Sequence, residues 1–185
     1  SLSADAIRQI KDSDSVTLYQ EPENRIAYIG FNSRYEQLSD PAVREALIMA
    51  VDASALLAAY QENMATENRL PLPILNWGWD ESLLEYIPEY DPEAAKQLLA
   101  DAGYEDGFTL KCTLAQGNDE LMRAVTVLQS YWEEIGVNLE ITAVSGSELT
   151  EMYTTGSVQV WATTQGGTSD PATFIGYFTS EAKLN

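Results

Sequence analysis

The residues best suited to hold a small ligand lie near the end of the chain, in the polar stretch Thr163-Thr164-Gln165-Gly166-Gly167-Thr168-Ser169. Val158, Val160 and Trp161 precede it and favour an extended strand. Asp170-Pro171 follows, and Asp before Pro is a good helix start because Pro has no N–H to leave unpaired. In such a strand–loop–helix unit, backbone N–H groups point at a ligand beyond the strand's carboxyl end. The alternative is a plain connection that needs glycine for its turns.

Nucleophilic and metal-dependent chemistry has few candidate residues in this chain. It contains no His and a single Cys, Cys112. This excludes disulfides, Cys/His zinc sites, Ser-His-Asp triads and Cys-His pairs within the chain. Cys112 falls in the apolar-alternating run Phe108–Leu114, which predicts a buried small hydrophobic residue. We therefore predict no catalytic residue, no metal and no cofactor.

Acidic residues dominate the charge, with 29 Asp and Glu against 10 Lys and Arg and a net charge of −19. This balance argues against nucleic acid or an anionic membrane surface as a partner. A carboxylate-dependent enzyme such as a glycosidase would need two acids across a cleft. Asp170, Glu148 and Asp80 are available for that role, although each is also explained as a helix cap or a solvated side chain.

The length and hydrophobicity of the chain fit one soluble α/β domain. It has 185 residues, of which 45% are hydrophobic, and no apolar run reaches the roughly 18 residues of a membrane span. The first residues, SLSADAIRQI, have the pattern of a helix already under way, so we expect the chain to begin inside a longer protein. From Asp91 onward, helices and strands alternate, which predicts parallel strands joined by crossovers.

The expected elements follow from caps and hydrophobic periodicity. The predicted helices are Ala4–Lys11, Pro41–Val51, Ala53–Tyr60, Pro92–Ala102, Asp119–Ile135, Gly146–Tyr153 and one starting at Pro171. The predicted strands are Val16–Tyr19, Ile26–Phe31, Phe108–Leu114, Val137–Val144 and one beginning near Val158. Nothing in these elements indicates an oligomer, so we expect a monomer.

A long loop, Asn68 to Pro88, carries three prolines and the aromatic group Asn76-Trp77-Gly78-Trp79. Long ordered loops in compact domains are often functional. In an extended backbone Trp77 and Trp79 would point the same way and offer two flat faces to a ligand. Equally, both could fill the core or a join to a neighbouring domain.

Three motifs together resemble a known family. They are Phe31-Asn32 with Asp40-Pro41-Ala42-Val43-Arg44-Glu45-Ala46-Leu47 and Val51-Asp52, then Asp91-Pro92-Glu93-Ala94-Ala95-Lys96-Gln97-Leu98-Leu99 with Ala102-Gly103-Tyr104, then Asp170-Pro171 with Phe174. In this order they resemble the extracellular solute-binding proteins of ABC importers, of the dipeptide, oligopeptide and nickel type (family five). The resemblance covers nearly the whole chain.

The resemblance implies that residues 1–185 are the second lobe of a two-lobed protein. Its fold would be the type II periplasmic-binding-protein class, a mixed sheet with flanking helices. The implied function is to capture a peptide-like or other small polar solute between the lobes and deliver it to the permease subunits. The implied location is extracellular, either periplasmic or as a cell-surface lipoprotein, and the implied state is a monomer. A surface protein-interaction domain that uses the Pro-Trp loop is a further alternative.

The ligand-contacting residues predicted for this lobe are Thr163, Thr164, Gln165, Gly166, Gly167 and Thr168, with Trp77 and Trp79 second. In the family, the loop before the Asp-Pro pair commonly carries an aspartate that pairs with the amine of a bound peptide. Counting back from Asp170, that position is Gly167, and Thr164 stands where a Trp is usual. This departure argues against recognition of a free amine by the loop.

We predict that the 185-residue chain folds alone but binds solute weakly, because a solute held between two lobes loses about half its contacts when one lobe is absent. A loss of about 4 kcal/mol weakens binding roughly a thousandfold. Calorimetry of the isolated chain with peptides and oligosaccharides measures this. Micromolar or tighter binding of any small solute would contradict the two-lobe interpretation.

Overall fold

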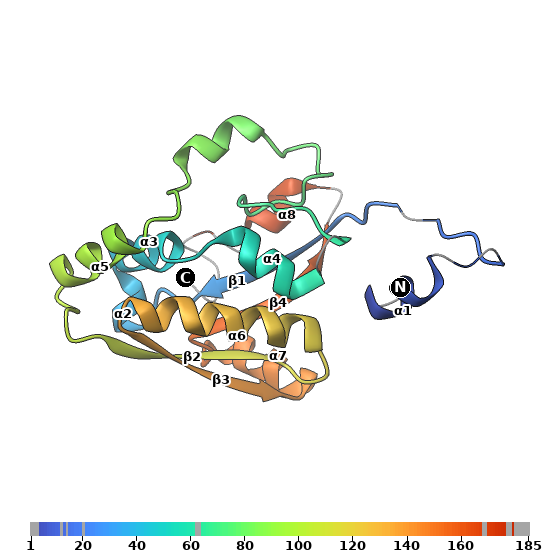
Figure 1. Ribbon diagram of the computed structural model, residues 1–185. Coiled ribbons are helices and arrows are strands. Elements are labelled where there is room, and N and C mark those ends of the chain that lie inside the picture. The colour runs from blue at the N-terminus through green and yellow to red at the C-terminus, as the bar shows by residue number, and fades with distance from the viewer. Residues whose placement is uncertain are drawn as a thin grey trace.

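A computed structural model describes residues 4–11, 13, 15–19, 21–61, 64–167, 170–176 and 179. Its four strands are β1 (Arg25–Phe31), β2 (Phe108–Ala115), β3 (Val137–Val144) and β4 (Val160–Gly166). Its helices are α1 (Ala4–Ile10), α2 (Glu36–Ser39), α3 (Pro41–Met49), α4 (Ala53–Gln61), the 3₁₀ helix η2 (Glu81–Tyr86), α5 (Pro92–Asp101), α6 (Asp119–Glu134), α7 (Gly146–Thr155) and α8 (Pro171–Ile175). Helix α1 lies apart from the body of the domain (Figure 1).

The strands form one mixed sheet in the order β1-β4-β2-β3. Strand β2 is parallel to both β3 and β4, as the alternation of helices and strands predicted. Strand β1 is antiparallel to β4, in a register that runs from Arg25 opposite Gly166 to Phe31 opposite Val160. The predicted mixed α/β fold is therefore confirmed, and the carboxyl ends of β2, β3 and β4 share one edge.

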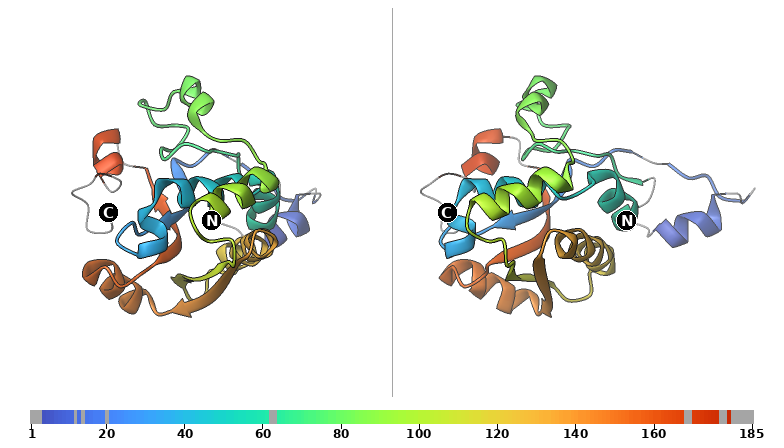
Figure 2. Two further views of the ribbon diagram at one scale, coloured as in Figure 1. Left: turned by 90° about the vertical axis from the view of Figure 1, so that its left-hand side faces the viewer. Right: turned by 60° about the vertical axis from the view of Figure 1, so that its left-hand side comes forward.

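Helices cover both faces of the sheet (Figure 2). Helix α6 packs on the face that carries Leu110 and Leu114, with its buried side chains in the same cluster as those of α3 and α5. Helix α7 covers the other face, where its Met152 borders a small cavity together with Lys111 and Thr113. The layers are thus helix, sheet and helix, the arrangement typical of α/β domains.

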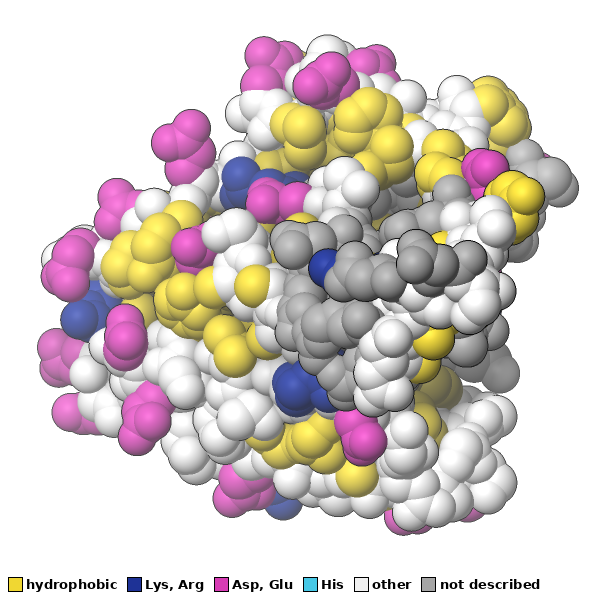
Figure 3. All heavy atoms as spheres, turned by 45° about the vertical axis from the view of Figure 1, so that its right-hand side comes forward, with side chains coloured by type: hydrophobic (Ala, Val, Ile, Leu, Met, Phe, Trp, Pro, Cys, Tyr) yellow, Lys and Arg dark blue, Asp and Glu magenta, His cyan; other side chains and the backbone are white. Residues whose placement is uncertain are grey.

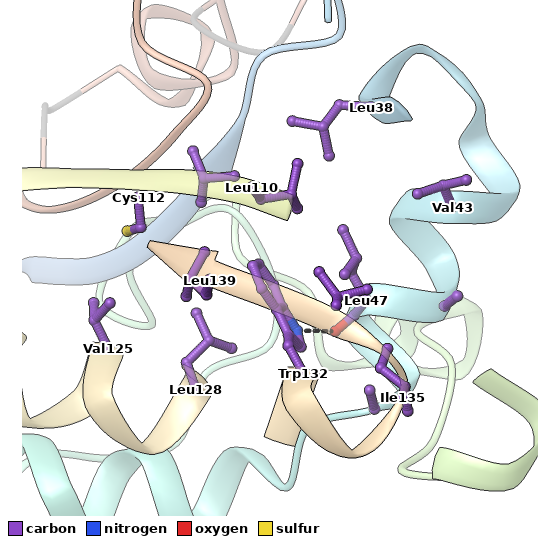
Figure 4. Close-up of a cluster of buried hydrophobic side chains, with 14 of the residues drawn as sticks. Leu38, Val43, Leu47, Leu110, Cys112, Val125, Leu128, Trp132, Ile135 and Leu139 are labelled. Carbon is purple, nitrogen blue, oxygen red and sulfur yellow. Dashed lines mark hydrogen bonds between the residues drawn. The ribbon is translucent and has the colours of Figure 1, made fainter. Parts of the chain in front are cut away.

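Trp132 lies at the centre of the main core (Figure 4). Its indole is 1% exposed, and its Nε1 donates a hydrogen bond of 3.0 Å to the carbonyl of Leu47, in the last turn of α3. Carbonyls at helix ends lack intrahelical partners, so this bond satisfies a buried acceptor while it ties α6 to α3. Cys112 is also fully buried here, and burial raises the pKa of its thiol to about 12.

Capping residues begin the helices where the sequence indicated. Asp40, Asp91 and Asp170 each accept a backbone N–H from the first turn and each precedes a Pro. The predicted strand Val16–Tyr19 is wrong, because residues 16–19 form no strand. An isolated extended segment is not a strand unless a neighbour pairs with it. The 68–88 loop also differs from the prediction, because η2 interrupts it.

We expect Trp132→Phe to lower the free energy of unfolding by about 2 kcal/mol, because the change leaves the Leu47 carbonyl unpaired and opens a cavity. Trp77→Phe is the matched control: Trp77 is 78% exposed, and its replacement should stay within about 0.5 kcal/mol of the parent. Urea denaturation followed by circular dichroism measures both. Equal effects of the two substitutions would contradict the central role of Trp132.

Candidate functional site

The polar stretch predicted as a loop is largely strand. Thr163, Thr164, Gln165 and Gly166 belong to β4 and pair with β1, so the loop begins only at Gly167. Thr168 lies outside the described residues. The prediction failed here because the pairing that extends β4 comes from a distant strand. The stretch nevertheless lies at the carboxyl end of a parallel strand, as predicted.

Strand geometry turns the predicted residues toward two different faces. Thr163 and Gln165 share a face with Trp161, whereas Thr164 lies on the opposite one. On the first face the Tyr28 hydroxyl donates to Gln165 Oε1 at 3.3 Å. Only the last residues of the stretch, Gly166 and Gly167, reach the edge of the sheet at which the parallel strands end.

Tyr153 of α7 lies on the same face as Thr163. Its ring packs edge-on against Trp161 with centroids 5.8 Å apart, and burial raises the pKa of its hydroxyl. Thr163 therefore lies on the face of the sheet that α7 covers, three residues before β4 ends. This places Thr163 further from the open edge than the sequence indicated.

Gly167 is held against the residue that precedes β1. Its N–H donates to the Asn24 carbonyl at 2.5 Å, and a Cβ at Gly167 would be 2.4 Å from the Asn24 side chain. Arg25, opposite Gly166, lies 3.0 Å from the carboxylate of Glu23. Sequence reasoning missed Asn24 and Arg25, because only the antiparallel pairing of β1 with β4 brings them to this edge.

Trp77 and Trp79 do not form the predicted pair of parallel faces. The segment is a turn closed by a bond of 2.9 Å from the Trp79 N–H to the Asn76 carbonyl. Trp77 is exposed, whereas Trp79 packs on a small cluster of buried residues and donates from Nε1 to Asn68 Oδ1 at 3.1 Å. The predicted common direction is wrong because the backbone is not extended there.

The turn does lie near the end of the glycine stretch. A Cβ at Gly78 would be 2.9 Å from Cγ of Pro171, the first residue of α8. Phe174 of α8 shares the small cluster with Ile26 of β1 and with Trp79. The aromatic turn, α8 and the end of the β1–β4 pair are thus neighbours, and of the two Trp residues in the turn Trp77 is the exposed one.

Two of the three carboxylates considered for an enzyme cap helices, and the third is exposed. Asp170 Oδ1 accepts from the Ala172 N–H at 2.9 Å. Asp80 caps η2 by accepting from the hydroxyl and the N–H of Ser82, bonds that hold the pKa of its carboxyl below the usual value. Glu148 is exposed on α7. Within the described ranges, no group of three acidic or Cys side chains could hold a metal ion.

Comparison with known proteins identifies the class. The family model of the bacterial extracellular solute-binding proteins, family 5 (middle segment), matches residues 1–185, and the chain belongs to this family. The family is one of solute-binding proteins, and the relatives described below are binding proteins, not enzymes. In the part of the chain that the structure describes, no helix is long and apolar enough to cross a membrane.

Individual relatives agree with this assignment. The chain is 33% identical over 135 residues to heme-binding protein A of Haemophilus influenzae, covering 71% of this chain and 24% of that protein. It is 28% identical over 174 residues to the dipeptide-binding protein of Escherichia coli, covering 91% and 32%. The fold matches the periplasmic binding protein DppA of Helicobacter pylori, solved with the peptide STSA, with a TM-score of 0.85 at 19% identity, covering 95% and 34%. The chain therefore spans a quarter to a third of these relatives.

We expect Gly167→Ala to destabilise the protein by about 1 kcal/mol, because the new Cβ overlaps the Asn24 side chain. Shortening the neighbour in the double variant Gly167→Ala/Asn24→Ala should recover most of the loss, as coupled contacts do in a double-mutant cycle. The matched control is Gly146→Ala, where a Cβ meets nothing within 4 Å. Additive effects of the two substitutions in thermal unfolding would show that Gly167 and Asn24 are not in contact.

Proposed function

We propose that residues 1–185 form one lobe of the extracellular receptor of an ABC importer, which captures a small polar solute between two lobes and delivers it to the permease. The observation that carries the proposal is the family match, which covers residues 1–185. The chain covers only 32% of the dipeptide-binding relative. The rest of such a protein has room for a second lobe. A periplasmic or lipoprotein-anchored location belongs to the same proposal.

The proposed contact region of this lobe is the place where β4 ends beside the start of β1, together with the aromatic turn. It comprises the predicted residues Thr164, Gln165, Gly166 and Gly167, and exposed Trp77. Backbone groups next to Gly166 and Gly167 supply hydrogen bonds, and the Trp77 ring supplies a flat apolar surface. Closure of a second lobe would remove water from this edge and strengthen these contacts.

The chemistry of the edge favours a solute without a free amine at this position. A buried ammonium group is costly unless an opposite charge and hydrogen bonds meet it. Gly167 offers no charge, and Asn24 occupies the space that a longer side chain there would need. The Asp170 carboxylate accepts from the Ala172 N–H of α8. These contacts support a neutral, hydroxyl-rich or amide-rich solute, such as an oligosaccharide or a longer peptide bound by its backbone.

The test is a thermal-shift comparison on the full-length protein with dipeptides, the same dipeptides N-acetylated, longer peptides and oligosaccharides. A ligand at a hundredfold excess over its Kd adds about 2.7 kcal/mol to stability, enough for a clear rise in Tm. We expect longer peptides or oligosaccharides to raise the Tm. We expect N-acetylation of a dipeptide to leave the Tm shift that the dipeptide causes unchanged. Strong stabilisation by free dipeptides that acetylation abolishes would contradict the proposed chemistry, and no shift with any of these solutes would contradict the proposed function.

A further inference from the structure

A small pocket lies between α7 and the sheet, on the face of β2 and β3 that points away from the main core. Its volume is about 230 Å³, and Lys111 and Thr113 of β2 and Val144 of β3 line it from the sheet. Glu148 and Met152 of α7 line it from the helix, and the segment that leads into β4 closes another side. Pockets for drug-sized ligands measure roughly 300–1,000 Å³, so this pocket suits a smaller molecule.

Thr113 places a polar group at the bottom of this pocket. The residue is only 4% exposed, and its neighbours Cys112 and Leu114 belong to the core on the opposite face of the sheet. The Thr113 hydroxyl therefore points into the pocket, and it has no hydrogen-bond partner among the described residues. Polar groups this deeply buried are normally paired, so the partner of this hydroxyl is expected to come from what occupies the pocket.

Two further polar groups of the pocket are held in fixed directions. Gln159 Oε1 accepts from the Lys111 N–H at 2.7 Å, which leaves the Gln159 Nε2 group as a donor of set orientation. The Tyr35 hydroxyl donates to the Ser157 carbonyl at 3.1 Å, so its oxygen remains an acceptor. Both side chains line the pocket. A ligand would meet groups that are already ordered, which reduces the entropy lost on binding.

The charges around the pocket do not favour an anion. Lys111 and Glu148 both line it, and the Lys111 ammonium lies 3.8 Å from the Glu140 carboxylate. The chain has a net charge of −19, and acidic side chains are spread over the face that Figure 3 shows, with few basic ones among them. This field repels small anions. The balance of one basic and one acidic side chain at the pocket is suited to a neutral ligand.

We propose that the pocket binds a neutral molecule with several hydroxyl groups, of the size of a monosaccharide. Each hydroxyl of such a ligand both donates and accepts, which matches the Thr113 hydroxyl, the Gln159 Nε2 group and the Tyr35 oxygen. The C–H groups of the ligand pack against Met152 and Val144, the apolar part of the lining.

This pocket is separate from the contact region proposed for the transported solute. Thr113 lies opposite Trp161 in the pairing of β2 with β4. Gly167 follows Trp161 by six residues, which is about 20 Å of extended chain. The inference therefore goes beyond the proposed function and does not rest on it.

Calorimetric titration of the full-length protein with glucose, galactose, mannose and N-acetylglucosamine tests the proposal. We expect at least one of these sugars to bind with a Kd of about 1 mM or lower. Thr113→Val keeps the shape of the side chain without its hydroxyl and should weaken that binding about tenfold. Gln159→Glu keeps the acceptor for the Lys111 N–H but removes the donor, so it should weaken binding as well. The matched control is Thr109→Val, on the same face of β2 but exposed, which should leave the Kd unchanged.

Three results would overturn the proposal. The first is the absence of binding at sugar concentrations up to about 10 mM. The second is binding that Thr113→Val leaves unchanged. If Trp77→Ala abolished that binding instead, the sugar would belong to the contact region proposed for the transported solute. The third is binding of free glycine or serine in place of the sugars, weakened by Thr113→Val, because the ligand would then be zwitterionic.

Thermal unfolding without ligand tests the unpaired hydroxyl separately. We expect Thr113→Val to keep the Tm within about 2 °C of the parent, because the hydroxyl makes no contact that the substitution removes. A larger fall in Tm would show that the hydroxyl has a structural partner and would overturn the proposal. The peptide and oligosaccharide comparison described above is independent of this result, so a failure of either proposal can be told from a failure of the other.

Discussion

The antiparallel pairing of β1 with β4 is the interaction on which the rest of the arrangement depends. It joins residues 25–31 to residues 160–166, and it alone brings Asn24 next to Gly167. The pairing has a strict steric condition near the end at which β4 begins. A Cβ at Gly30 would lie 2.2 Å from the Trp161 ring, so the indole occupies the space that a side chain at this position would need. Trp161 in turn supports Tyr153, which connects the pairing to α7.

Local signals made much of the fold predictable from the sequence. The Asp-Pro pairs at Asp40 and Asp91 determine helix starts through bonds within four residues, so no distant contact is needed to recognise them. The alternation from α5 to α8 was equally clear, because each element there has its own periodicity and turn. The resemblance to the solute-binding family also followed from these local motifs and is confirmed by the family match.

The parts that sequence reasoning missed depend on distant contacts. The end of β4 is set by β1, and nothing within Thr163–Gly166 indicates that partner. Trp77 and Trp79 are separated by a turn that Gly78 forms against Pro171, a contact between distant parts of the chain. The small cluster of Ile26, Leu72 and Phe174 has the same character, since its members come from three separate segments. Site geometry at the edge of a sheet is therefore less predictable than the helices beside it.

The parallel pair β2–β3 has a consequence for the order of folding. Helix α6 connects the two strands, and all three lie in one continuous stretch between Phe108 and Val144, so their contacts close short loops. Strand β1 is made early but can pair only after β4 exists, more than half of the chain later. During synthesis, Ile26–Phe31 must therefore remain an unpaired apolar segment until β4 has been made. The acidic character of the surrounding chain is suited to this interval, because charge repulsion between molecules slows their aggregation.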